Sequence, residues 1–251
     1  MSQMSFQHIL ANRLSAWFPF PRIVSARFRR HRFAQIIPIG VNCEVAFRFY
    51  RRWGFVDSSL AAWAQLYGLD TTVRMLRNLS SVMTGEATFE PQSKMWKCGN
   101  TGVKFHGKLK YGHIDTPGEI AADLADLRSR VAHLREKLLR FATNGAETLL
   151  IHRLSEIDER ETDRLARRLD ALEAALAGLG ARNWRLLVIC EEPFLAHMPK
   201  GPNRAFRSVR RFNPTDDVTN ADLGDGVGWQ AIFTEFAPLK VLPKKHAFKF
   251  E

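Results

Sequence analysis

The stretch that most constrains the fold of this chain runs from Ile36 to Gly54. It opens with a short apolar run, Ile36–Ile39, and turns at Gly40. After the turn, apolar residues recur at helical spacing with arginines between them, which is the pattern of an amphipathic helix. The sequence therefore predicts a strand, a tight turn and a helix in direct succession.

The predicted turn brings a thiol to the start of the helix. Asn42 is a favoured N-cap residue, so Cys43 is expected in the first helical turn. Free backbone N–H groups and the positive end of the helix dipole favour an anion there, which lowers the pKa of a cysteine and makes it nucleophilic. Cys43 is therefore the candidate nucleophile. The alternative is a small buried cysteine, because unpaired cysteines are often buried.

A resemblance to a known family rests on this turn and on the residues after it. The run Gly40-Val41-Asn42-Cys43-Glu44-Val45-Ala46-Phe47, a basic helix, Ser58-Ser59 and Trp63 together resemble a bacterial family of unknown function described as papain-like cysteine peptidases. In that family a Gly-x-Asn-Cys turn precedes a Pro-Phe-Asp-Trp-like segment and a Phe-(x)-His motif. The resemblance spans about Ile36 to Trp229 and implies a papain-like α/β fold with Cys–His chemistry.

The chain departs from the family pattern at two places. Ala61-Ala62 stands where many members have Phe-Asp before the tryptophan, so that acid is absent. The histidine motif is Phe105-His106-Gly107-Lys108 and lacks the Asp that often follows. The residue that would orient the imidazole stays unassigned among four acidic residues: Asp115, Glu156, Asp158 and Glu191.

His106 is the imidazole that we expect to act as general base. An imidazole suits a thiol nucleophile because its pKa lies near working pH, and His106 follows a predicted hairpin of strands over 95–98 and 103–105. The alternative is a surface histidine in a glycine-rich hairpin. His113 is a weaker competitor, and His152, on a predicted buried strand, is expected to be structural. Asn42 is the nearest side chain for a second oxyanion donor, and is equally a helix cap.

Length and composition indicate one core in a reducing compartment. The chain has 251 residues, 45% of them hydrophobic, which is enough for a single substantial core. Three cysteines are few and odd in number for a disulfide framework, so we expect a cytoplasmic location. No apolar run reaches the roughly 18 residues that span a bilayer, and the N-terminus lacks the pattern of a signal peptide.

Much of the excess positive charge lies near the N-terminus. The formal net charge is +11, and residues 1–43 contain no Asp or Glu but six arginines. We therefore expect a basic, aromatic-rich leader over 1–34 and a single papain-like domain over 35–251. Such a leader suits an anionic surface, such as the inner face of a membrane. Pro19 and Pro21 interrupt a long amphipathic helix and favour a leader that packs on the domain or is loosely held.

The rest of the chain alternates predicted helices and strands. Thr116, Pro117 and Glu119 form the pattern of a capped helix start, and that helix should end at Asn144-Gly145. Asp158, with Glu161 as partner, is expected to cap another. Further helices are expected over 60–67, 71–81 and 228–233, and strands over 148–152, 184–190 and 209–212. This alternation predicts an α/β layer fold with a small mixed sheet, at least partly parallel, flanked by long helices.

No cofactor or metal ion is expected. Cys98, His106 and His113 lie close in sequence, but their spacing fits no standard zinc pattern and a fourth ligand is missing. The Gly40 turn lacks the Walker lysine and the dinucleotide-binding glycines. Nucleic acid is not an expected partner, because no readout motif is present.

Two functional hypotheses follow. The first is a cysteine hydrolase (peptidase or amidase) or acyltransferase that uses Cys43 and His106 on an unknown acyl or peptide substrate through a covalent acyl-enzyme. The second is a non-catalytic papain-like scaffold whose basic leader contacts an anionic partner, either a membrane surface or a polysaccharide.

Overall fold

The computed structural model describes residues 31–41, 44–53, 59–108, 116–210 and 226–238. The predictions for the leader over 1–30, and those for Asn42, Cys43, His113 and Asp115, lie outside these residues. The last residues assigned to the leader, His31–Phe33, form strand β1 and pair in parallel with β10 (Phe236–Pro238). His31–Phe33 therefore belong to the folded domain and not to the leader.

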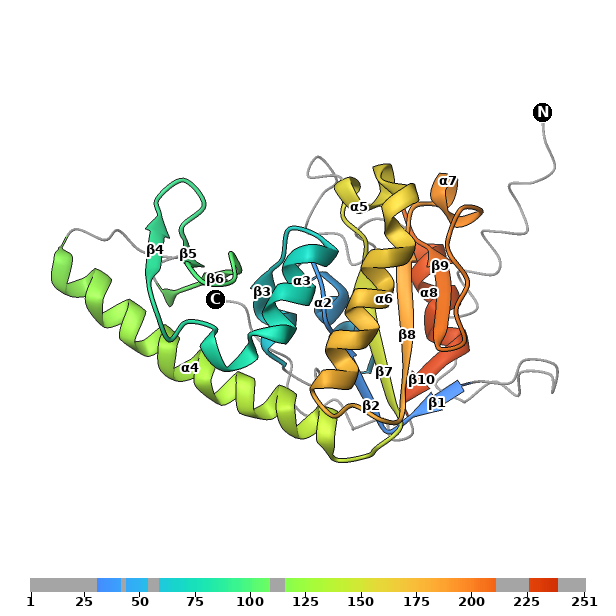
Figure 1. The fold of residues 1–251 in the computed structure, drawn as a ribbon, viewed down its shortest axis with the longest axis horizontal. Helices are drawn as coiled ribbons and strands as arrows, with labels where there is room; N and C mark the ends of the chain where they lie inside the picture. Colours follow the sequence, from blue (N-terminus) through green and yellow to red (C-terminus); the bar gives the residue numbers. More distant parts are fainter. Residues whose placement is uncertain (1–30, 42–43, 54–58, 109–115, 211–225, 239–251) are drawn as a thin grey trace, which may run out of the picture. The chain divides into compact units, whose positions relative to one another are not determined.

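A sheet of four parallel strands forms the centre of the fold (Figure 1). Its order is β2-β7-β8-β9, which is also the order in the chain. The register pairs Ile37 with Leu150 and Leu150 with Leu186. The predicted strands over 148–152 and 184–190 are confirmed. The four strands are β2 (Gln35–Pro38), β7 (Thr148–Arg153), β8 (Trp184–Cys190) and β9 (Arg204–Ser208).

Successive side chains of these strands point to opposite faces of the sheet, and each face has its own hydrophobic cluster. Ile37 and Leu150 pack with helices α3, α4 and α6, whereas Leu149 and Leu187 pack with α2 and α8. The sheet is therefore the middle layer of a three-layer α/β structure. The helices are α2 (Glu44–Trp53), α3 (Leu69–Arg77), α4 (Pro117–Thr143), α6 (Thr162–Gly178) and α8 (Gly226–Glu235).

A second sheet is antiparallel, with the order β3-β6-β5-β4. Its inner face, which includes Trp96 and Phe105, joins the same cluster as α3 and α4. Parallel and antiparallel strands thus lie in different sheets, whereas the sequence predicted a single mixed sheet. The strands are β3 (Ala64–Gln65), β4 (Ala87–Glu90), β5 (Met95–Cys98) and β6 (Lys104–His106).

The predicted start of the long helix is confirmed, whereas Asp158 does not cap the helix predicted after it, which is α6 and follows Glu161. At α4, Thr116 Oγ1 accepts from Glu119 N at 3.3 Å and Glu119 Oε2 accepts from Thr116 N at 3.1 Å. At α5 (Glu156–Arg160) the N-cap is Ser155, not Asp158. Asp158 is the return partner, because its position three residues later lets its carboxylate reach the Ser155 backbone. Helix α6 then begins at Thr162 without a side-chain cap.

Short elements account for the other differences from the predictions. The helix expected over 60–67 is a 3₁₀ turn, Leu60–Trp63, followed by β3, because Ala64 and Gln65 pair with β6. The strand expected over 209–212 is wrong at residues 209 and 210, because β9 ends at Ser208, and residues 211 and 212 lie outside the described residues. The helix expected over 71–81 is α3 followed by a second 3₁₀ turn, Leu79–Ser81. One further short helix is α7 (Glu192–Leu195).

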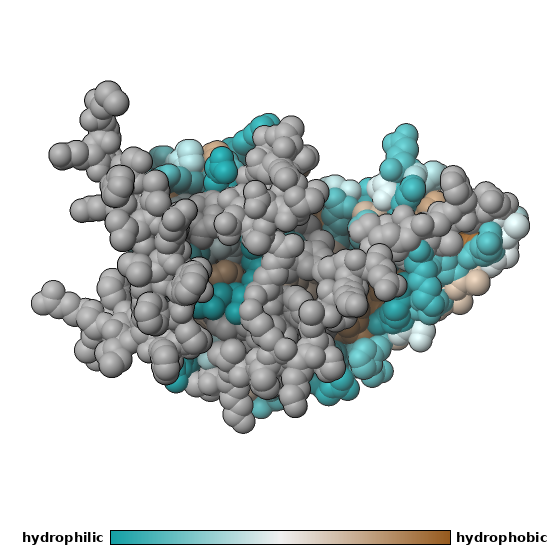
Figure 2. All heavy atoms as spheres, turned by 180° about the vertical axis from the view of Figure 1, so that it is seen from behind, coloured by the Kyte–Doolittle hydropathy of each residue, from teal (hydrophilic) through white to brown (hydrophobic). Residues whose placement is uncertain are grey.

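Within the described ranges, no helix combines the length and the apolar character needed to cross a bilayer. From behind, the described surface is mostly hydrophilic, with only small hydrophobic areas (Figure 2). Among the residues that the structure describes, the exposed large hydrophobic side chains are Trp63, Tyr67, Leu139 and Ile157.

The packing of helices α4 and α6 can be tested with a matched pair of leucines. Leu169 on α6 is fully buried, whereas Leu139 on α4 is 45% exposed. We expect Leu169→Ala to lower the free energy of unfolding by about 2–5 kcal/mol, because it removes buried methyl groups and leaves a cavity. Leu139→Ala should change it by less than about 0.5 kcal/mol. Urea unfolding followed by circular dichroism measures both, and similar losses in the two variants would contradict this packing.

Candidate functional site

The carboxyl edge of the parallel sheet carries the predicted Cys43 turn. In open parallel sheets ligands bind at this edge, where the strands end. In Figure 1 the edge lies at the end of the sheet where α5 and α7 follow β7 and β8. Strand β2 ends at Pro38 and α2 begins at Glu44, so the predicted succession of strand, turn and helix is confirmed. Asn42 and Cys43 lie outside the described residues, and the structure describes the chain on both sides of them.

The turn contains a strained backbone position. Val41 has a φ of 63°, and a β-branched side chain makes this left-handed conformation a genuine outlier. Such strain costs about 1–3 kcal/mol and clusters at functional sites. Two hydrogen bonds hold the turn: Leu66 N donates to the Val41 carbonyl at 2.8 Å, and Ser59 Oγ donates to the Pro38 carbonyl at 3.1 Å.

His152 lies directly against Gly40 of this turn. A Cβ added at Gly40 would lie 1.9 Å from His152 Nδ1, so only glycine fits beside this ring. His152 is completely buried, and neither ring nitrogen has a hydrogen-bond partner among the residues that the structure describes. Burial lowers the pKa of His152 to about 4, against weaker opposing effects of the Asp158 charge and the Ile39 backbone. The imidazole is therefore neutral at pH 7, and its predicted place on a buried strand is confirmed.

The next residue, Arg153, holds the other end of the turn. It ends β7 and points to the opposite face of the sheet from His152. Its Nη1 donates to Glu44 Oε1 at 2.8 Å, and its Nη2 donates to the Val209 carbonyl at 3.3 Å. The Arg153 side chain is only 4% exposed and that of Glu44 is 17% exposed. A largely buried ion pair thus joins the end of β7 to the first residue of α2.

Two more buried carboxylates connect loops at this edge. Both Asp158 oxygens lie 3.2 Å from Leu69 N at the start of α3, and Glu159 Oε1 accepts from Glu191 N at 2.8 Å. Asp158 is thus occupied in capping two helices. Among the other acids named as the third catalytic residue, Glu156 is exposed, Glu191 is half-buried and Asp115 is not described.

The predicted base, His106, is the last residue of β6 and is exposed on the outer face of the antiparallel sheet. The register pairs Ala64 with Phe105, which puts Trp63 beside His106. Leu66, which bonds to the Val41 carbonyl, follows the same strand, β3. Since a strand rises about 3.3 Å per residue, His106 lies roughly 10 Å along the sheet from Leu66. About 10 Å along the sheet thus separates His106 from the residue that contacts Val41.

Asp123 is a site residue that the sequence reasoning missed. This buried carboxylate on α4 accepts from Lys108 N and from Trp96 Nε1, both at 2.7 Å. A Cβ added at Gly107 would lie 1.9 Å from Asp123 Oδ2. Asp123 therefore fixes the backbone immediately after His106. It could have been found in the sequence, because it lies three residues after Ile120 and four before Leu127, on the apolar face of the predicted helix.

The other two cysteines are free and buried. Burial opposes ionisation of Cys98, but hydrogen bonds from Thr101 and from nearby backbone amides, including that of Met83, bring its pKa below the ordinary value. Burial and the Glu159 charge raise the pKa of Cys190 to about 12. Cys98 is on the inner face of the antiparallel sheet and His106 on the outer face. No group of three or more metal-binding side chains occurs in the described ranges.

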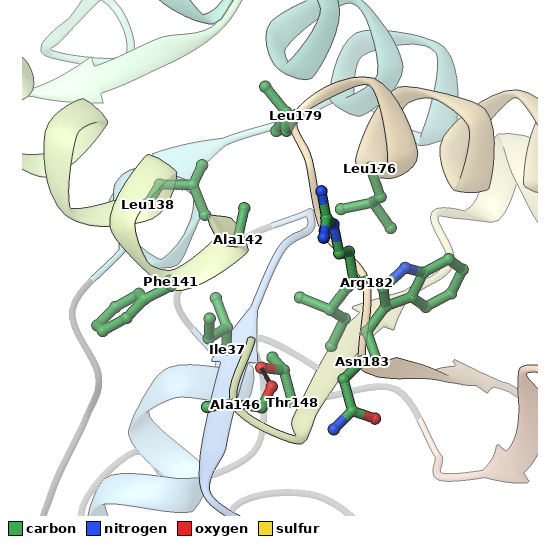
Figure 3. A pocket seen from close by; sticks show the side chains of 13 residues that line it. Ile37, Leu138, Phe141, Ala142, Ala146, Thr148, Leu176, Leu179, Arg182 and Asn183 are labelled. Atoms are coloured by element: carbon green, nitrogen blue, oxygen red, sulfur yellow. Dashed lines mark hydrogen bonds between the residues drawn. The ribbon is translucent and has the colours of Figure 1, made fainter. Parts of the chain in front are cut away.

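A small pocket lies at the opposite, amino end of the strands (Figure 3). Leu138, Phe141 and Leu176 line it, and Thr148 and Trp184 mark the starts of β7 and β8 beside it. Its volume is about 20 Å³, which is room for about one water molecule. It is far too small for a substrate.

No protein-family model, no curated protein and no solved structure matches this chain.

The buried state of His152 predicts how stability depends on pH. Its pKa is about 4 in the folded protein against 6.5 for the ordinary value. Between these values the unfolded chain binds more protons, so the free energy of unfolding should fall as the pH is lowered, by up to about 1.4 kcal/mol per pH unit from this group. His152→Leu should remove this contribution, whereas His133→Gln, at an exposed position on α4, should not.

Chemical denaturation at pH 7, 6, 5 and 4 measures the effect. If His152→Leu keeps the full pH dependence of the unsubstituted protein over this range, the ring is not held neutral in the fold.

Proposed function

We propose that this chain is a thiol-dependent acyl-transfer enzyme, a hydrolase such as a peptidase or amidase or else an acyltransferase, with Cys43 as its nucleophile. The observation that carries the proposal is the strained turn at Val41, between a buried parallel strand and the start of α2, at the edge of the sheet where ligands bind. A cysteine that directly precedes the first residue of a helix is in the environment that lowers a thiol pKa.

In the proposed reaction, the Cys43 thiol gives its proton to an imidazole, for which His106 remains our candidate. The thiolate attacks a carbonyl carbon, and the protonated imidazole returns the proton to the leaving group as the acyl-enzyme forms. Water or another acceptor then takes the acyl group and restores the thiol. The Cys43 backbone N–H and the Asn42 side chain are the proposed donors to the oxyanion.

Asp123 supports the role of His106 through the backbone. It binds Lys108 N, two residues after His106, and the Gly107 backbone packs against its carboxylate. The residues directly after His106 are Gly107 and Lys108 rather than an acid, and the carboxylate that binds the backbone at the end of β6 comes from α4. The papain-like part of the proposal rests on the sequence motifs, whereas the sheet supports only the α/β layer architecture.

One observation favours the alternative of a non-catalytic scaffold. Ala61 and Ala62, which replace the Phe-Asp of many members of the resembling family, are both completely buried. The carboxylate that many members of that family have directly before the tryptophan is thus absent before Trp63. The negative charge that it would bring to the site is absent as well. A scaffold of this kind would use its basic leader to contact an anionic membrane or polysaccharide.

Iodoacetamide alkylation of the three cysteines separates the two functions. Because Cys98 and Cys190 are buried, an exposed but ordinary Cys43 would also react faster than they do. The informative quantity is therefore the pH at which the alkylation rate of Cys43 reaches half of its maximum, which we call its midpoint. We expect a midpoint at least one pH unit below the 8.5 or so of a free cysteine, and a rate at pH 7 that falls several-fold in His106→Ala.

Mass spectrometry of tryptic peptides measures the rate at each site between pH 5 and 9. Exposed His133→Ala on α4 is the control, and should leave both the midpoint and the rate unchanged. A midpoint near that of a free cysteine, with no effect of His106→Ala, would contradict the catalytic function and leave the scaffold.

A further inference from the structure

The outer face of the antiparallel sheet carries two exposed aromatic side chains. Exposure alternates along β3 and the residues beside it. Ala64 and Leu66 are buried in the core, whereas Trp63 is 39% exposed and Tyr67 is 49% exposed. Side chains that alternate in this way lie on opposite faces of a strand. Trp63 and Tyr67 therefore lie on the face that points away from the core, with the half-buried Gln65 between them.

The two rings present separate surfaces. They are four residues apart, which is about 13 Å along a strand at roughly 3.3 Å per residue. Aromatic rings pair with each other when their centres are about 4.5–7 Å apart, so Trp63 and Tyr67 do not stack on one another. Each ring therefore contributes its own exposed surface to the outer face.

Lys104 of β6 fixes the orientation of the Tyr67 ring. Its ammonium lies 4.8 Å from the centre of that ring and forms an ion pair with Glu90 of β4. Because β5 lies between β4 and β6, this pair crosses the outer face above β5. The Lys104 side chain is only 14% exposed, so it orients Tyr67 rather than meeting a ligand itself. A ring that is held before a ligand arrives loses less entropy on binding.

The charge exposed on this face is positive. Lys97 of β5 and His106 of β6 are both exposed, and the register puts Lys97 opposite Lys104 on the outer face. Glu90 is the one acidic residue within strands β3 to β6, and Lys104 pairs with it. A ligand that complements this face must therefore combine negative charge with flat surfaces that stack on aromatic rings.

Single-stranded nucleic acid has this combination. Proteins that bind single strands without sequence preference use aromatic side chains on which bases stack and cations that contact the backbone. Sheets with exposed aromatic residues are a common form of this surface. A double helix does not complement the face, because its bases are stacked on one another and are not free to stack on protein rings. This mode of binding also needs no readout motif.

We propose that the outer face of the antiparallel sheet binds single-stranded nucleic acid without sequence preference, with Trp63 and Tyr67 as stacking residues and Lys97 as a phosphate contact. Gln65, between the two aromatic residues, supplies an amide that can donate to or accept from a base edge. The proposal goes beyond the function proposed for Cys43 and does not depend on it. Its test measures no thiol chemistry, so the two proposals can fail separately.

Fluorescence anisotropy of the full chain with a labelled oligothymidylate of about 15 nucleotides tests the proposal. Loss of one stacked base weakens binding by roughly fivefold to 150-fold, so Tyr67→Ala should bind at least about fivefold more weakly. Tyr67→Phe keeps the ring and should bind like the unsubstituted protein. The control is Leu139→Ala, which removes a similarly exposed hydrophobic side chain from α4 and should have no effect.

A duplex of the same length separates stacking from simple attraction of charge. The six arginines among residues 1–43 attract any polyanion, single-stranded or double-stranded. Tyr67→Ala should therefore leave the affinity for the duplex unchanged. Lys97→Gln should lower the slope of log affinity against log salt for the single strand by about 0.7, the value of one phosphate contact. Lys200→Gln, at an exposed position after α7, should not change that slope.

The opposite outcomes are as clear. If oligothymidylate does not bind, or if Tyr67→Ala binds it as tightly as the unsubstituted protein does, the proposal is wrong. It is also wrong if polygalacturonate, an anionic polysaccharide, binds in place of oligothymidylate and Tyr67→Ala abolishes that binding, because the partner is then a glycan. If Tyr67→Ala fails to fold, Lys97→Gln decides, because an unchanged salt dependence contradicts the proposal.

Discussion

The structure depends on β7, the strand between β2 and β8 in the parallel sheet. All six of its residues are buried, and its side chains supply both hydrophobic clusters. Leu150 packs toward α3, α4 and α6, and Leu149 and Ile151 pack toward α2 and α8. The same alternation continues past the apolar part of the strand, where His152 and Arg153 replace aliphatic residues. The strand that forms the core therefore also determines where the Cys43 turn lies.

The sequence predicted those parts of the fold that depend on local patterns. The capping box at Thr116 and the apolar seam of α6 were found because helix starts and helical periodicity are short-range signals. The 3₁₀ turn at Leu60–Trp63 was missed because its continuation as β3 depends on pairing with a strand some 40 residues later, a range that local patterns do not cover. Asp158 was misassigned because Ser155, three residues earlier, is an equally good cap.

The strand and the helix on the two sides of the candidate turn were predictable from the sequence, but the residues packed around the turn were not. The residues of β2 and α2 were placed correctly, because glycine, asparagine and the apolar face are all local signals. Arg48 on α2 is buried, with its guanidinium 5.8 Å from the centre of the Trp229 ring. That contact comes from α8, far along the chain. The partners of Gly40 and Glu44 were likewise invisible in the sequence, because each comes from an element more than 100 residues away.

The contact between Gly40 and His152 has an evolutionary consequence. The ring occupies the space where any other residue at position 40 would put its Cβ. A lineage that keeps a large side chain at position 152 therefore cannot replace Gly40. It can do so only after the side chain at position 152 has become smaller. Descendants of this chain would change the two positions together or keep both, and Gly40 would be retained for reasons of space alone.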